Sequence, residues 1–229
     1  MPTMSDFRNA IDGLLQSATS LNPLYRLNRN REDSALEVLV FSMCCEAVTR
    51  LNGTVELRTI RGSAIPASTF VFRGAPGNIW SQYDDFGYAY CEIGNNQFEI
   101  HMNVKCLGTS KANHEIDISF IKSSEADRAR REEEHPKSSG VLAAIECKYY
   151  TSSDVLTTEG RTFVGLLDDF GQNMQFECFV TNRGSAQLRL YFSLKRRPER
   201  FMEMNPLVSN QLEDFINNLK LRIGKWAAV

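Results

Sequence analysis

The chain has 229 residues, of which 42% are hydrophobic and 24% are charged, and its formal net charge is −2. These values are typical of one soluble globular domain, and they argue against a disordered chain or a generically basic nucleic-acid binder. No apolar run approaches the ~20 residues of a membrane span, so we expect no membrane association. The six cysteines include no Cys-x-x-Cys pair, which is typical of reduced thiols, and we expect a cytoplasmic protein.

The first half of the chain combines two helical patterns with strand-like runs. An amphipathic pattern over residues 5–20 predicts an N-terminal helix, and a second apolar stripe over residues 34–51 predicts another, with Ser34 as its N-cap. Strand-like runs follow at residues 69–78, 88–93 and 97–106. Gly94 and the two asparagines after it predict a hairpin turn between the last two runs.

The second half predicts, in order, a strand, a polar surface excursion, a strand, a helix and a strand, at residues 116–121, 122–140, 141–148, 160–170 and 176–181. Alternation over residues 187–194 predicts an edge strand, and residues 207–226 predict a closing helix. We therefore expect one α/β domain over residues 1–229, with a mixed β-sheet flanked by helices. Its core spans about residues 34–182, with the helix at 5–20 and a strand and helix within 186–226 appended.

Two acidic residues and a lysine interrupt or end the apolar strands. Asp117 lies inside the run at residues 116–121, and Glu146 and Lys148 end the continuous apolar run that begins at Val141. Side chains alternate along a strand, so Glu146 and Lys148 share a face. If the two strands are neighbours, all three side chains converge. Such a grouping is expected, because burying a lone carboxylate among β-formers is costly.

This combination suits phosphodiester hydrolysis. Two carboxylates supply hard oxygen ligands for Mg²⁺, and an ammonium can hold a water or stabilise negative charge on phosphate. Alone, a Glu-x-Lys tripeptide is more often a solvated surface pair. The apolar run before Glu146 favours a site instead, because such a strand is covered on both faces. Cys147 alternates with these charges, so we expect its thiol to pack inside and to be inert.

At these residues the sequence resembles the PD-(D/E)xK, or restriction-endonuclease-like, nuclease superfamily. Its signature is an acidic residue on one strand and (D/E)-x-K on the next, matched here by Asp117 and by Glu146 with Lys148. The resemblance implies a core of helix, three strands, helix and strand (αβββαβ), and the patterns above occur in that order. The first motif is His114-Glu-Ile-Asp117 rather than Pro-Asp. That strand and the Phe72-Arg-Gly-Ala-Pro-Gly77 segment are also similar to bacterial restriction or phage-defence nucleases.

The resemblance also implies a glutamate on the first core helix that completes the site. Glu37 and Glu46 are the candidates, about 180° apart around the helix, so only one can face the site. We prefer Glu37, in the first turn, although an acidic residue there is also favoured by the helix dipole alone. Glu115 has the strand parity of Asp117 and is a further metal-ligand candidate, and Glu99 is a weaker one. The backbone carbonyl of Cys147 is the remaining candidate ligand.

Basic residues that could grip phosphates form two groups, each of which could equally be solvated surface charge. Arg29 and Arg31 precede the first core helix, and Lys195, Arg196 and Arg197 follow the expected edge strand. The leading hypothesis is a Mg²⁺- or Mn²⁺-dependent DNA endonuclease of restriction or defence type, which acts as a homodimer or with a partner protein. The alternatives are a catalytically weak nucleic-acid-binding or assembly module of the same fold, and a nuclease for RNA or single strands.

Overall fold

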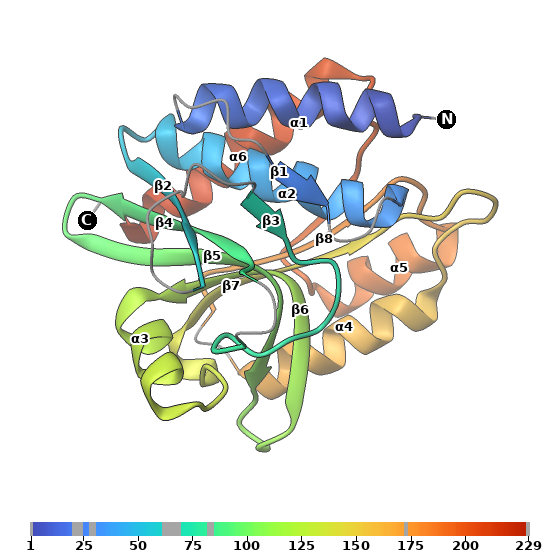
Figure 1. Ribbon diagram of the computed structural model, residues 1–229. Helices are drawn as coiled ribbons and strands as arrows, with labels where there is room; N and C mark the ends of the chain where they lie inside the picture. The colour runs from blue at the N-terminus through green and yellow to red at the C-terminus, as the bar shows by residue number, and fades with distance from the viewer. Residues whose placement is uncertain are drawn as a thin grey trace.

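The computed structural model describes residues 2–19, 25–27, 31–60, 70–81, 85–171 and 174–227. Its centre is a seven-stranded mixed sheet in the order β2-β4-β5-β6-β7-β8-β9 (Figure 1). Neighbouring strands from β2 to β7 are antiparallel, whereas β7, β8 and β9 are parallel to one another. The strands are β2 Thr54–Thr59, β4 Gly87–Ile93, β5 Asn96–Leu107, β6 Asn113–Lys122, β7 Val141–Lys148, β8 Phe176–Thr181 and β9 Arg200–Glu203. Short parallel strands β1 (Tyr25–Leu27) and β3 (Phe70–Phe72) form a separate pair. The expectation of an α/β chain with a mixed sheet is confirmed.

Helices cover both faces of this sheet. One apolar cluster joins the sheet to α1 (Met4–Thr19), α2 (Glu32–Thr49) and α6 (Ser209–Ala227). A second cluster joins the opposite face to α3 (Ser123–Glu132), α4 (Thr157–Phe170) and α5 (Ala186–Lys195), as Figure 1 shows below the sheet. A single 3₁₀ turn, η1 (Ser138–Gly140), precedes β7. None of the helices in the described ranges has the length and apolar content that crossing a membrane requires.

Helix α2 is the most deeply buried helix, because it lies between the sheet and the two terminal helices. From Ser34 to Val48 every residue is buried except Glu37, which is half-buried. A helix that is apolar all round is typical of such a position. The helix begins at Glu32 after Arg31, which has an extended backbone, so the prediction of Ser34 as N-cap is wrong.

The strands that carry the candidate acidic residues are direct neighbours. β6 and β7 are antiparallel, with Ile118 opposite Ile145. The strand of Asp117 therefore lies directly beside the strand of Glu146 and Lys148, as their convergence requires. The segment between them is more than a surface excursion. It contains α3, whose Ala126 and Ala129 are fully buried against the sheet.

The prediction of an edge strand at residues 187–194 is wrong, because these residues form α5. Ser185 caps the helix, with its hydroxyl accepting a hydrogen bond from the Leu188 amide at 3.2 Å. Leu188 and Phe192, four residues apart, face the core, while Leu190 and Leu194 face outward. Leucines on both sides of the helix produced the apparent alternation. The edge strand of the sheet is instead β9, which the sequence did not suggest.

Candidate active site

The antiparallel pairing of β6 and β7 brings Asp117, Glu146 and Lys148 together. The Lys148 Nζ lies 2.5 Å from Glu146 Oε1 and 3.3 Å from Asp117 Oδ2. All three side chains are largely buried, with exposed fractions of 9% for Asp117, 13% for Glu146 and 24% for Lys148. The convergence expected from the sequence is therefore present, with one ammonium between two carboxylates.

The residue between Glu146 and Lys148 holds Asp117 through its backbone. The Cys147 amide donates a hydrogen bond to Asp117 Oδ2 at 2.7 Å. The thiol of Cys147 points the other way and is buried in the apolar cluster beneath α1 and α2. This burial raises the pKa of the thiol well above its ordinary value, as expected for an inert packing residue.

Glu37 approaches the three residues from α2, and Asn103 of β5 fixes its position. The Asn103 Nδ2 donates to Glu37 Oε2 at 2.7 Å and to the Arg73 carbonyl at 3.0 Å, so both of its hydrogens have acceptors. Asn103 has a φ of 51°, in the left-handed region that asparagine tolerates better than most residues. The β5–β6 register accordingly passes from Met102–Ile118 to Val104–Ile116 without a pair at Asn103 and Asp117.

A surface hollow of about 410 Å³ opens over Asp117, Glu146 and Lys148. Glu115 and His114 of β6 form one side of it, and Thr162, Phe163, Gly165 and Leu166 of α4 form another. His114 is held by Asp169, with 2.6 Å between Nε2 and Oδ2. Glu37 lies behind this group and does not line the hollow. The charged residues are thus accessible to a ligand from the side of α4.

The charges at this site compensate one another incompletely. Burial and, after it, the neighbouring Asp117 carboxylate raise the pKa of Glu37 and of Glu146 to about 8. Burial alone would lower the pKa of Lys148, but its interactions with Asp117 and Glu146 outweigh burial and raise this pKa. One ammonium among three carboxylates therefore leaves two of them favouring the protonated form.

The donor set suits a hard divalent cation. Within the described ranges, the polar contacts of Asp117 and Glu146 use one oxygen of each, which leaves Asp117 Oδ1 and Glu146 Oε2 for a ligand. Mg²⁺ favours oxygen donors and retains several waters, so two carboxylates can suffice. Across the described residues, no three His, Cys, Asp or Glu side chains already form a group that could hold a metal ion.

The other acidic candidates have different surroundings. Glu115 lines the hollow, and its charge contributes to the raised pKa of Glu146. Glu99 is bound by His101 and Arg130, away from the hollow. Glu46 is buried and forms an ion pair with Arg50 at 2.8 Å. Of the two glutamates on α2, Glu37 is the one beside Asp117, as preferred from the sequence.

The basic candidates for phosphate binding do not form one surface. Arg31 is exposed and lies 3.3 Å from Asp33. Lys195 and Arg196 are exposed at the end of α5, but the guanidinium of Arg197 already binds Glu177 and Asp168. Arg29 lies outside the described residues. Arg197 is therefore a weaker candidate than the sequence indicated.

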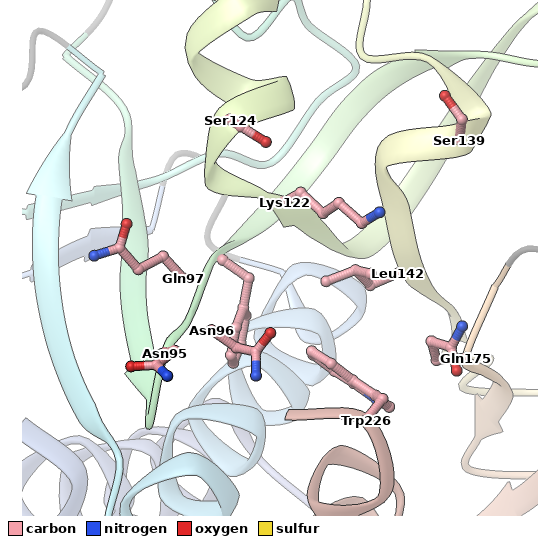
Figure 2. Close-up of a pocket in the computed structure, with 10 residues that line it drawn as sticks. Asn95, Asn96, Gln97, Lys122, Ser124, Ser139, Leu142, Gln175 and Trp226 are labelled. Carbon is pink, nitrogen blue, oxygen red and sulfur yellow. The ribbon is translucent and has the colours of Figure 1, made fainter. Parts of the chain in front are cut away.

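A larger hollow, of about 620 Å³, lies at the opposite end of the same strands (Figure 2). Its polar lining consists mainly of amides and hydroxyls, with Lys122 as the charged residue and Trp226 as the main aromatic. Among the described residues that line it there is no carboxylate, histidine or cysteine, which are the usual side-chain donors of a metal site.

Sequence reasoning missed Asn103 and His114 as components of the site. Asn103 stood out only as a polar position within a strand pattern, and its left-handed backbone had no signature in the sequence. His114 has the opposite strand parity to Asp117, which would place it on the other face of a regular strand. Comparisons of the chain with known protein families, with curated proteins and with solved structures give no match.

Proposed function

We propose that this protein is a metal-dependent nuclease that hydrolyses phosphodiester bonds, most simply a DNA endonuclease. The observation that carries the proposal is the convergence of Asp117, Glu146 and Lys148 at the floor of an open hollow, with Glu37 behind them. Buried carboxylates with raised pKa values are costly to the fold, and they are typical of functional sites.

Asp117 and Glu146 would be the principal ligands of Mg²⁺ or Mn²⁺, with Glu37 and the Cys147 carbonyl as further donors and Glu115 at the edge of the site. Bound there, the ion would supply Lewis-acid stabilisation of phosphate oxygens and a more acidic water. The Cys147 amide orients Asp117 for this role through its 2.7 Å hydrogen bond. Asn103 orients Glu37 in the same way.

Lys148 would act directly on the substrate. Its ammonium stays charged at neutral pH, because Asp117 and Glu146 raise its pKa. From between the two carboxylates it can donate a hydrogen bond to the attacking water or to a phosphate oxygen that gains negative charge. Phe163 and Leu166 of α4, which line the hollow, would limit the access of bulk water.

The order of elements also supports a restriction-endonuclease-like core. Helix α2, strands β5, β6 and β7, helix α4 and strand β8 occur in the order αβββαβ along the chain, with further strands inserted between α2 and β5 and with helix α3 and the turn η1 inserted between β6 and β7. The acidic strand and the Glu-x-Lys strand are neighbours in the sheet. This likeness in arrangement adds to the argument from the site, which carries more weight.

Some of the basic residues predicted from the sequence are exposed and could contact a phosphate backbone. They are Arg31 just before α2, and Lys195 and Arg196 at the end of α5. A homodimer would allow both strands of a duplex to be cut. RNA and single-stranded DNA fit the same chemistry, so they belong in the test.

The test is cleavage of supercoiled plasmid, single-stranded DNA and RNA with Mg²⁺ or Mn²⁺, beside a control with EDTA. We expect metal-dependent nicking that Asp117→Ala and Lys148→Ala abolish without unfolding the protein. Lys122→Ala, at an exposed position on the same strand as Asp117, serves as the matched control and should leave cleavage unchanged. Cleavage that survives both site substitutions would reject the proposal.

A further inference from the structure

Three leucines on the α4 and α5 side of the molecule are unusually exposed. The exposed fractions are 58% for Leu156, 60% for Leu190 and 75% for Leu194. All three line one hollow of about 640 Å³ between the start of α4 and the outer side of α5. We call Leu156, Leu190, Leu194 and Tyr191 the leucine surface. Isolated exposed leucines are ordinary, but several that share one hollow mark an interaction site.

The leucine surface follows from the way α5 packs. Leu188 and Phe192 anchor the inner side of the helix, and Gly160 of α4 admits them closely, with an added Cβ meeting Leu188 at 2.4 Å. Leu190 and Leu194 are four residues apart, so they lie one above the other on the outer side. In Figure 1 α4 and α5 lie side by side below the sheet, with no described helix covering them.

Two cations flank these leucines without an anionic partner. Arg161 and Lys195 both approach the ring of Tyr191, at 6.0 Å and 5.9 Å from its centroid. Neither forms an ion pair with any residue in the described ranges.

The described acidic residues near this surface already have partners, and Glu159, two residues before Arg161, accepts a hydrogen bond from the Tyr150 hydroxyl at 3.1 Å. Asp154 lies 3.2 Å from Arg183, and Glu203 lies 2.5 Å from Arg189. The leucine surface is therefore apolar at its centre and positive at its edge, and no described carboxylate forms an ion pair with Arg161 or Lys195. A partner with negative charge would complement this edge.

We propose that the leucine surface binds an amphipathic helix of a partner protein, one with an apolar face flanked by Asp or Glu. Apolar side chains of that helix would fill the hollow between Leu156, Leu190 and Leu194. Its carboxylates would pair with Arg161 and Lys195. This is helix-in-groove recognition, in which spaced apolar anchors supply affinity and the charged rim supplies orientation.

Charge favours this occupant over the alternatives. A second copy that docked through the same surface would add more cations to it. Nucleic acid would pair with Arg161 and Lys195, but its phosphates would leave the leucines uncovered. The partner would also lie next to the candidate active site, because the adjacent residues Thr162 and Phe163 of α4 line the catalytic hollow.

The test uses three fluorescent synthetic helices of equal length and fluorescence anisotropy. The first helix carries leucines on one face and glutamates beside them, the second replaces the glutamates with lysines, and the third replaces the leucines with serines. We expect the full-length protein to bind the first helix at least about tenfold more tightly than the others. Leu194→Ser and Leu190→Ser should each weaken that binding about tenfold.

Matched variants separate the leucine surface from general stickiness. Leu221→Ser removes a leucine of α6 that is 59% exposed, and it should leave binding unchanged. Arg161→Glu should reverse the preference between the glutamate and lysine helices, whereas Arg131→Glu on α3 should not. Melting temperatures of all variants show that each one folds.

Each contrary outcome overturns the proposal in a distinct way. No binding of the first helix up to about 1 mM, or equal loss with Leu221→Ser, shows that the leucine surface does not recognise such a helix. A dimer in sedimentation that Leu194→Ser dissociates assigns the surface to a second copy. Binding of DNA that depends on Arg161 and not on Leu194 assigns it to nucleic acid. None of these readouts depends on nuclease activity.

Discussion

The buried carboxylate of Glu99 on β5 and the carboxylates of the candidate active site show how differently this fold treats negative charge. Glu99 of β5 is 1% exposed, and Arg130 binds both of its oxygens, at 2.5 Å and 2.8 Å, while His101 lies at 2.6 Å. Burial would raise the pKa of Glu99, but these hydrogen bonds and charges outweigh burial and lower it. At the candidate active site, by contrast, Glu37 and Glu146 have pKa values raised to about 8.

The difference lies in the partners and not in the degree of burial. The Glu99 cluster is complete within the chain, because Arg130 reaches down from α3 to pair with it. The candidate active site has three carboxylates and one ammonium, so without a further cation two of its carboxylates favour the protonated form. A buried carboxylate with its own arginine is thus structural, and one that lacks a partner indicates a ligand site.

The sharpest way to break this comparison is to remove one charge from each cluster. Asp117→Asn should lower the rate of cleavage about 10³-fold or more, because it removes a carboxylate that we propose as a metal ligand while preserving shape. Glu99→Gln should leave cleavage per folded molecule unchanged and should lower thermal stability instead. Initial rates of plasmid nicking and melting curves, measured on both variants, separate the two roles. Equal losses of activity would contradict the distinction.

The next largest effect, on stability, should come from separating Glu99 from Arg130. Arg130→Met leaves Glu99 buried without its bidentate partner, which should lower the free energy of unfolding by about 3 kcal/mol. The matched change Arg131→Met, at a side chain that is 70% exposed, should stay within about 0.5 kcal/mol. Denaturant unfolding measures both. A small effect of Arg130→Met would mean that Glu99 is stabilised in another way.

The stability that Glu37 contributes at the candidate active site should change with pH in the opposite direction to that of Glu99, because the pKa of Glu37 is raised and that of Glu99 is lowered. Since the pKa of Glu37 is raised from about 4.5 to about 8, the folded protein retains a proton that the unfolded chain has lost within this window. Its stability therefore falls as pH rises through the window. Without metal, Glu37→Gln should stabilise the protein by about 2 kcal/mol at pH 8.5 and by little at pH 4.5.

This pH prediction is checked by thermal or denaturant unfolding in EDTA at several pH values. Glu133→Gln, at an exposed position at the end of α3, controls for the loss of one negative charge. A gain from Glu37→Gln that is the same at every pH would show that the carboxyl is not held in its protonated form.

The smallest effect should come from Glu115. Its charge helps to raise the pKa of Glu146, so Glu115→Gln should lower that pKa and move the acidic limb of the cleavage profile slightly to lower pH. We expect less than about a tenfold change in rate at pH 8. A loss as large as that of Asp117→Asn would make Glu115 a principal ligand.

The sequence predicted the elements that carry the site because their patterns are local and strong. The continuous apolar run before Glu146 predicted a buried strand. Alternation of side chains along that strand placed Glu146 and Lys148 on one face. The helical phase showed that Glu37 and Glu46 cannot both face the site, and the preference for Glu37 rested on its position near the start of the helix. The structure places Glu37 close enough to Asp117 for the two carboxylates to interact.

The parts that the sequence did not predict depend on tertiary contacts. Leu190 and Leu194 are exposed, so α5 shows no single apolar stripe, and alternation favoured a strand there. Arg130 pairs with Glu99, 31 residues away along the chain, which the charge run of α3 alone does not indicate. The left-handed Asn103 is stabilised by acceptors from α2 and from the segment after β3.

The most direct test of the central claim is titration of Mn²⁺ into the metal-free protein by calorimetry, in two buffers with different heats of ionisation. We predict binding that releases protons and strengthens as pH rises from 6 to about 8.5, because Glu37 and Glu146 must lose protons to become ligands. Asp117→Ala should abolish this binding, and Glu99→Gln should preserve it. Absence of binding to the wild-type protein, or binding that Asp117→Ala leaves unchanged, would contradict the assignment of a metal-dependent site.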